Sequence, residues 1–176
     1  LLGIGGMQLY KAETPGPLKD TKLTPRIKET AKALWYLYLA MTVFCAGAYK
    51  LFGMSTYDSI CHAFSTVSIG GFSTHDESFG YFLQPAIRWT AVFFMIIAGI
   101  NFALHYVAWN KKSISHYFND SEVKAYMFIL ACAFGLTFLT LNVYNLESKG
   151  NLLAESAFQV VSIATTTGFL TANYSN

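Results

Sequence analysis

Two short stretches of small and polar residues could carry the chemistry of this chain. The first is Ser68-Ile69-Gly70-Gly71 and the second is Thr165-Thr166-Thr167-Gly168, and a phenylalanine follows each. Threonine favours an extended backbone because its side chain is β-branched, and glycine permits backbone angles that other residues avoid. Carbonyl oxygens along such a backbone can replace the hydration shell of a monovalent cation. We therefore predict that these eight residues form a cation site, mainly through their backbone carbonyls.

The two stretches belong to an internal repeat with an offset of 97 residues. Repeats of this kind commonly build membrane transport paths, with the site where the repeats meet. Either stretch alone would suggest an ordinary surface loop after a glycine that ends a helix, and the repeat decides against that interpretation. Six pairs of residues coincide at this offset: Asp58 with Glu155, Ser59 with Ser156, Ser65 with Ser162, Gly71 with Gly168, Phe72 with Phe169, and Thr74 with Thr171.

Three long apolar segments must position these stretches. Residues 33–54, 89–109 and 125–144 each have roughly the 20 residues needed to cross a hydrocarbon core, and the last two carry no Asp, Glu, Lys or Arg. Charged residues make up 12% of the chain, about half of what a soluble domain contains. The composition predicts an all-α polytopic membrane protein.

Each predicted cation stretch follows a helix-compatible segment that is too short to cross the membrane, 55–67 and 152–164. Non-helical backbone is tolerated at membrane depth only where protein buries it or a watery cavity solvates it. The C-terminal end of each short helix also carries partial negative charge, which favours a cation. We therefore predict repeated units of span, pore half-helix with filter loop, and span, a pore architecture like that of potassium channels.

The predicted units have the following boundaries. Residues 1–10 end a preceding transmembrane helix and 11–32 form a connector. Residues 33–109 form a complete unit, with span 33–54, half-helix 55–67, filter 68–72 and span 86–109. Residues 110–124 form a second connector. Residues 125–176 begin another unit, with span 125–144, half-helix 152–164 and filter 165–169. Since the chain opens without methionine and stops in a loop, we expect it to be an internal fragment.

The basic residues predict the orientation. Cytoplasmic loops of membrane proteins carry an excess of Lys and Arg, and the two connectors hold nine basic residues against three elsewhere. Both connectors are therefore expected to be cytoplasmic. Nucleic-acid binding is not indicated, because these charges are dispersed among acids and no aromatic residues alternate with them. The nine are Lys11, Lys19, Lys22, Arg26, Lys28, Lys32, Lys111, Lys112 and Lys124, and the three are Lys50, Arg88 and Lys149.

Two other classes of function remain as alternatives, an intramembrane enzyme and a structural or receptor module without transport. Ser73, His75 and Asp76 suggest hydrolase chemistry, but no nucleophile-elbow or HExxH motif is present. The three cysteines, Cys45, Cys61 and Cys132, are odd in number and lack CxxC spacing, which is untypical of a disulfide framework or metal site. We predict no catalytic residue and no bound organic cofactor. A structural module would not need the same glycine-ended half-helix twice.

Three sequence stretches carry a resemblance to a known family. GGMQLYKAETPGPLKD, HAFSTVSIGGFSTHDESFGYF and AFQVVSIATTTGF resemble the TrkH family, the potassium-translocating subunits of bacterial Trk systems in the Trk/Ktr/HKT superfamily. The resemblance covers essentially the whole chain. It implies four consecutive pore units around one pseudo-fourfold pore, of which this chain would hold the second and most of the third.

The resemblance also implies a function and partners. It implies potassium uptake through the bacterial inner membrane by a homodimer in contact with membrane lipid and with a cytosolic nucleotide-binding regulatory ring. Gly71 and Gly168 match the key filter glycines, so the eight residues above are the implied potassium ligands. The first and fourth filter loops and the gating loop of the family would lie outside this sequence. Serine at either filter glycine should lower the preference for potassium, whereas Gly53→Ser should change it little.

Overall fold

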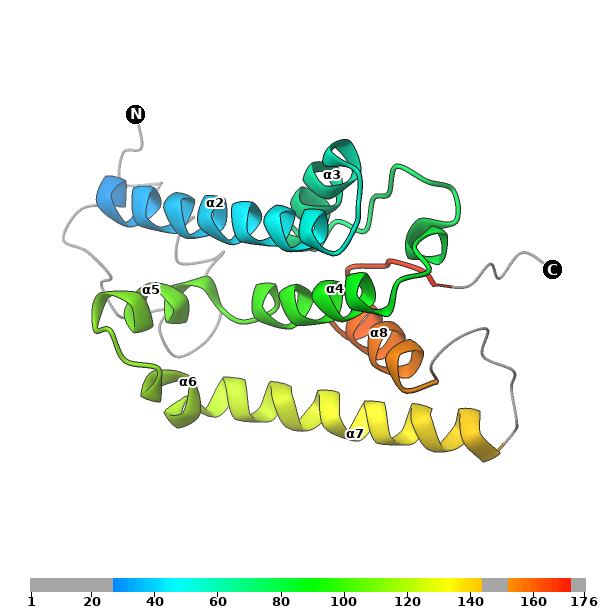
Figure 1. Cartoon of the computed structure of the whole chain (residues 1–176). Coiled ribbons are helices and arrows are strands. Elements are labelled where there is room, and N and C mark those ends of the chain that lie inside the picture. The colour runs from blue at the N-terminus through cyan, green and yellow to red at the C-terminus, as the bar shows by residue number, and fades with distance from the viewer. Residues whose placement is uncertain (1–26, 144–151, 172–176) are drawn as a thin grey trace. The chain divides into compact units, whose positions relative to one another are not determined.

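The computed structural model of the chain describes residues 27–143 and 152–171 (Figure 1). Within these ranges the chain is helical and contains no β-strand, in agreement with the predicted all-α fold. The predicted helix end at 1–10 and most of the connector at 11–32 lie outside the described residues. The elements are α2 (Ile27–Leu51), α3 (Thr56–Val67), the 3₁₀-helix η2 (Ser78–Tyr81), α4 (Pro85–Ala98), α5 (Phe102–Asn110), α6 (Ser115–Asn119), α7 (Ser121–Val143) and α8 (Leu152–Ala164).

The chain divides into two compact units. One comprises Leu1–Ala40 with Ile100–Ala125, and the other comprises Met41–Gly99 with Tyr126–Asn176. In the first unit, α5 packs against α6, and His105 Nδ1 lies 2.8 Å from the Tyr117 hydroxyl. In the second unit, α4 packs against both α3 and α8. Both predicted cation stretches and both half-helices belong to this second unit.

The two longest helices begin earlier in the chain than the apolar segments do. Helix α2 starts at Ile27, inside the predicted connector 11–32, because residues 28–33 are mostly good helix formers. Helix α7 starts at Ser121 and not at residue 125, because Asp120 caps it. The Asp120 carboxylate accepts hydrogen bonds from the backbone N–H groups of Glu122, at 2.9 Å, and Val123, at 3.0 Å. Helix propensity and capping thus extend both helices beyond the apolar runs.

The structure differs from the single continuous span expected over residues 86–109. Helix α4 ends at Ala98 and α5 begins at Phe102. Gly99 closes α4 with a hydrogen bond from its N–H to the Met95 carbonyl. The Asn101 side chain then accepts a hydrogen bond from Ala103 N at 3.0 Å and starts α5. Asparagine is a favoured N-cap residue, so a new helix can start at this point although the hydropathy of the segment does not change.

An aromatic cluster forms the core of the second unit. The Phe79 ring from η2 is fully buried. Its centroid lies 4.5 Å from that of Phe169, 5.1 Å from that of Phe158 and 5.2 Å from that of His62. These rings come from both copies of the internal repeat. The cluster therefore joins the segment after the first half-helix to the second half-helix and its loop.

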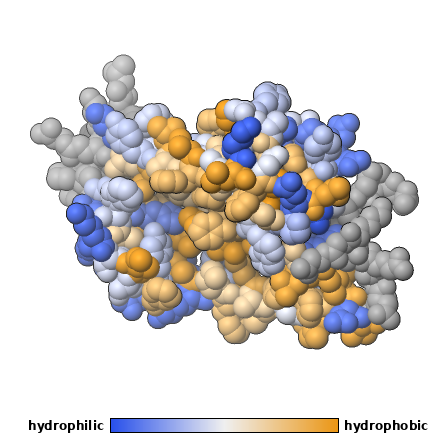
Figure 2. Space-filling model, in the orientation of Figure 1, coloured by the Kyte–Doolittle hydropathy of each residue, from blue (hydrophilic) through white to orange (hydrophobic). Residues whose placement is uncertain are grey.

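The outward faces of the long helices are apolar. Two described helices are long and apolar enough to cross a membrane, Ala31–Leu51 and Ser121–Val143, and α4 with α5 qualifies only if the two are taken as one broken span. Figure 2 shows apolar side chains over much of the drawn face. Soluble monomers rarely expose patches of more than a few hundred Å², so these faces are those of a membrane protein. The exposed side chains include Trp35, Val43, Phe44, Leu51, Phe128, Ile129, Leu136, Leu139 and Val143.

Candidate ion pathway

The two half-helices are present as separate short helices. Helix α3 spans Thr56–Val67, and α8 spans Leu152–Ala164. Ser55 caps the start of α3, since its hydroxyl accepts a hydrogen bond from Asp58 N at 3.0 Å. Each helix leads directly into one of the predicted cation stretches. The negative ends of both helix dipoles therefore point toward these stretches.

The backbone of the two loops repeats at the same offset as the sequence. After α3, Ser68 N donates to Phe64 O at 3.0 Å, and Ile69 N donates to Thr66 O at 3.2 Å. After α8, the corresponding bonds run from Thr165 N to Val161 O at 2.9 Å and from Thr166 N to Ile163 O at 3.0 Å. The internal repeat is thus a repeat of backbone geometry and not only of residue types.

Both loops turn through left-handed backbone at equivalent positions. In the first loop φ is 56° at Ile69 and 69° at Gly71, and in the second it is 62° at Thr166 and 82° at Gly168. Glycine adopts such angles without steric cost. A residue with a Cβ pays roughly 1–2 kcal/mol there, and β-branched Ile69 and Thr166 are unfavourable examples. Four positive φ angles in eight residues indicate a backbone shape that the surrounding structure imposes.

Among the described residues, the carbonyl oxygens of the two loops have no protein hydrogen-bond partner. Across the described ranges, none of the backbone carbonyls of residues 68–71 and 165–168 accepts a hydrogen bond. Backbone carbonyls in folded proteins are nearly always paired with protein or with water. The two runs of four carbonyls, which lack a protein partner among the described residues, are therefore available to water or to a cation.

The two loops contact each other. A Cβ built on Gly71 would collide with the carbonyl oxygen of Thr167 and would lie 3.3 Å from the carbonyl carbon of Gly168. Farther along, Leu170 N donates to the Ser78 hydroxyl at 3.3 Å. The structure thus brings together the two predicted stretches, which are far apart in the sequence, and Gly71 is one point where they meet.

Two of the three threonine hydroxyls, those of Thr165 and Thr167, lie in buried side chains. Thr165 Oγ1 donates to Val161 O at 2.7 Å and also lies 2.7 Å from Thr167 Oγ1. Both side chains are buried, whereas Thr166 is exposed. The hydroxyls of Thr165 and Thr167 thus bond locally, so the backbone carbonyls are the oxygens of these two residues that remain for an ion.

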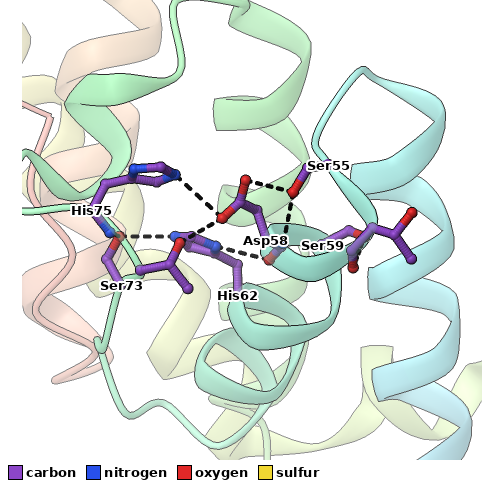
Figure 3. Close-up of polar contacts among 8 residues, drawn as sticks. Ser55, Asp58, Ser59, His62, Ser73 and His75 are labelled. Atoms are coloured by element: carbon purple, nitrogen blue, oxygen red, sulfur yellow. Dashed lines mark hydrogen bonds and ion pairs between the residues drawn. The ribbon is translucent and has the colours of Figure 1, made fainter.

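A polar network lies behind the first loop (Figure 3). His62, which is fully buried in α3, has Nδ1 2.8 Å from the carbonyl of Asp58 and Nε2 2.9 Å from the Ser73 hydroxyl. The Asp58 carboxylate accepts a hydrogen bond from Thr74 Oγ1 at 2.6 Å, and it lies 3.2 Å from His75 Nε2. The network fastens residues 73–75, which follow the first loop, to helix α3, which precedes it.

Asp58 is held as a carboxylate at the start of α3. The hydrogen bonds from Thr74 and then from Ser55 lower the pKa of Asp58 below its ordinary value, because they stabilise the ionised form. The helix N-terminus favours the same charge. The sequence shows Asp58 only as the counterpart of Glu155 in the repeat, so its contact with Thr74 and His75 is a finding of the tertiary structure.

The second loop has its own connection to its half-helix. Gln159 Nε2 donates to Thr171 Oγ1 at 2.8 Å, and Ser162 Oγ donates to Phe169 O at 2.8 Å. Gln159 occupies the position of His62 in the repeat. Sequence reasoning overlooked this pair, although two polar residues at matched positions of two apolar half-helices were a visible signal.

The His62–Ser73 contact does not make a hydrolase site. In a hydrolase triad a carboxylate orients the histidine, but His62 Nδ1 faces the backbone carbonyl of Asp58. The imidazole is also fully buried. Within residues 27–143 and 152–171 no three His, Cys, Asp or Glu side chains are grouped to hold a metal ion. The pair is placed to fasten two backbone segments together.

The backbone of Gly53 bears on its use as a control for the two loop glycines. Its φ is 105°, and a Cβ there would lie 2.9 Å from Gln84 Oε1. A serine at Gly53 would be strained by its backbone angle alone, so this residue is a poor neutral control. Gly47, near the C-terminal end of α2, has nothing within 4 Å of the added Cβ among the described residues, and it replaces Gly53 in that role.

Comparisons with known proteins agree with this geometry. A family model described as TrkH, cation transport protein, matches residues 1–176. The chain is 51% identical to the Trk system potassium uptake protein TrkH of Halomonas elongata, over 99% of this chain and 36% of that protein. It is 46% identical to the protein of the same name from Escherichia coli K12, over 97% of this chain and 36% of that protein.

A solved structure has the same fold. The crystal structure of the potassium transporter TrkH from Vibrio parahaemolyticus matches with a TM-score of 0.82 and 42% identity, over 95% of this chain and 37% of that chain. The chain thus spans little more than a third of the length of the relatives it matches. The family description names transport and not catalysis, which decides against the enzyme alternative. With its whole length matched, the chain belongs to the TrkH family of cation transport proteins.

Proposed function

We propose that the protein containing this chain carries potassium ions across the bacterial inner membrane, through a filter to which Ser68–Gly71 and Thr165–Gly168 contribute carbonyl oxygens. The observation that carries the proposal is the set of eight loop carbonyls at the negative ends of α3 and α8, which accept no hydrogen bond within residues 27–143 and 152–171. The names of the relatives specify potassium uptake, so we propose potassium as the transported cation.

The chemistry needed is replacement of a hydration shell. Carbonyl oxygens in a ring can take the place of the waters around a monovalent cation, and the helix dipoles add favourable potential without a fixed full charge. Asp76 and Glu77 are exposed beyond the first loop. Acidic residues at a mouth raise the local concentration of cations.

Two differences between the loops support a pore completed by further units of the same kind. Phe169 is 1% exposed against the aromatic cluster, whereas Phe72, its counterpart, is 81% exposed. A Cβ at Gly71 would meet the second loop, whereas one at Gly168 would meet nothing within 4 Å of the described chain. We infer that another unit covers Phe72 and that another filter loop faces Gly168.

The proposed partners follow from the family. We propose a homodimer in contact with membrane lipid, and a cytosolic nucleotide-binding ring beneath the pore. Lys111 and Lys112 are exposed in the second connector, and they offer a polar surface on the expected cytoplasmic side. This surface is where we expect the ring to bind.

Radioactive rubidium uptake tests the function. The full-length protein in lipid vesicles should take up rubidium, and external potassium should compete more strongly than sodium, because rubidium and potassium are similar in size. Vesicles without protein serve as the control. Uptake that is absent, or that sodium suppresses as well as potassium does, contradicts potassium-selective transport.

Cysteine labelling tests the orientation. Single cysteines at Glu77 and Asn119, both exposed, should react with an impermeant maleimide from opposite faces of the membrane. Glu77 is chosen in place of its neighbour Ser78, because Ser78 is buried and its hydroxyl accepts a hydrogen bond from Leu170 N. The three native cysteines are replaced beforehand. Reaction of both positions from the same face would contradict the unit of two spans with a re-entrant loop between them.

A further inference from the structure

We propose that His62 and Gln159 are positioning residues for ion selection, each acting as a brace that fixes the exit of one filter loop. The inference rests on the proposed function and adds residues outside both loops to it. It starts from a shared contact. A side chain in each half-helix reaches the hydroxyl of a residue that follows the loop, His62 to Ser73 at 2.9 Å and Gln159 to Thr171 at 2.8 Å.

The two braces are equivalent in position but not in chemistry. His62 and Gln159 are related by the offset of 97 residues, so each lies at the same height of its half-helix. Their partners differ by one residue in register, since Thr171 corresponds to Thr74 and not to Ser73. The same mechanical link is thus made with an imidazole in one repeat and a carboxamide in the other.

The contacts of His62 determine how its brace works. Its Nδ1 faces the Asp58 carbonyl, which can only accept a hydrogen bond, so Nδ1 carries the proton. In the neutral ring Nε2 then accepts, and the Ser73 hydroxyl donates to it. The same hydroxyl oxygen accepts a hydrogen bond from His75 N at 3.2 Å. One buried ring therefore holds the backbone from residue 73 to residue 75.

A brace is needed because the loops have an unfavourable backbone. Ile69 and Thr166 have positive φ angles, and in the described part of the chain no protein group donates a hydrogen bond to the loop carbonyls. Each loop is anchored at its start by the end of a helix. The brace anchors the other end, so the carbonyls keep their spacing around an ion. Ion selectivity is a difference between two binding free energies, and it depends on that spacing.

Exchange of the two chemistries gives a sharp test in the full-length protein. His62→Gln and Gln159→His each keep a side chain that can reach the segment after the loop. Both variants should therefore retain the wild-type ratio of potassium to sodium uptake within about twofold. His62→Leu and Gln159→Leu remove the link. Each should lower the ratio by about tenfold, which corresponds to about 1.4 kcal/mol. Cys61→Ala, next to His62 on α3 and half-buried, is the matched control and should keep the ratio.

The ratio separates positioning from folding. Loss of folded protein lowers the uptake of both ions equally and leaves their ratio unchanged. If the leucine variants do not fold, Ser73→Ala and Thr171→Val remove the hydroxyls on the other side of each link, and the same fall is expected. The inference is overturned if folded leucine variants keep the wild-type ratio. It is also overturned if His62→Gln and Gln159→His lower the ratio as much as the leucine variants do. A wild-type protein without any preference for potassium contradicts the proposed function instead, and the inference falls with it.

Discussion

Gly71→Ser is expected to lower the ratio of potassium to sodium uptake by at least about tenfold in the full-length protein. Two costs act together at this position. The φ of 69° is unfavourable for any residue with a Cβ, and that Cβ would collide with the Thr167 carbonyl of the second loop. Both loops must then move apart, which changes the spacing of their carbonyls. A change of about 1.4 kcal/mol is enough for a tenfold effect.

Gly168→Ser should have a smaller effect in the same assay. Its φ of 82° carries a similar backbone cost, but no described atom lies within 4 Å of the added Cβ. Gly47→Ser, in α2 and with no described atom within 4 Å of the added Cβ, should leave the ratio unchanged. Size-exclusion profiles in detergent are measured beside uptake and should stay those of the wild type. If Gly71→Ser kept the wild-type ratio, Gly71 would be an ordinary loop glycine and the proposed filter would be wrong.

Phe79→Ala should produce the largest loss of stability. The ring is fully buried, and it contacts Phe169, Phe158 and His62, with centroids 4.5 to 5.2 Å away. Removal of a buried phenylalanine typically costs about 3–5 kcal/mol, from lost burial and from the cavity left behind. The cluster joins the two repeats, so the second loop should lose its support as well.

Thermal unfolding in detergent measures this effect. Phe79→Ala should lower the melting temperature well below that of the wild type, while Phe79→Leu, which fills more of the space, should lower it less. Phe44→Ala is the control, since that ring is 73% exposed on the described chain. A melting temperature for Phe79→Ala equal to that of the control would show that the cluster does not hold the two repeats together.

Much of the local structure could be predicted from the sequence because local interactions determine it. Half-helix α8 occupies the predicted residues 152–164, and α3 begins one residue after the predicted start and ends at the predicted Val67. Glycine patterns and apolar length are properties of short segments, so they can be recognised without the fold. The boundaries of α2 and α7 were missed by several residues because capping and helix propensity act outside the apolar runs.

The chain's own repeat also belongs to what the sequence determined. It marked Gly71 and Gly168 as equivalent, and their φ angles of 69° and 82° agree with that. It could not distinguish them, because the collision of a Cβ with Thr167 depends on how two distant loops meet. The break between α4 and α5 was invisible for a related reason, since hydropathy does not record where a helix is capped.

Only the tertiary structure decided which polar side chains act together. Nothing in the sequence marks Asp58, His62 and Ser73 as a group. They are linked because the segment after the first loop folds back against α3. Burial then makes each contact matter, since a buried polar group without a partner is costly. The sequence by itself determined the membrane class, the repeat and the residues of the two loops. How the loops meet and what holds their far ends came from packing between segments that the sequence keeps apart.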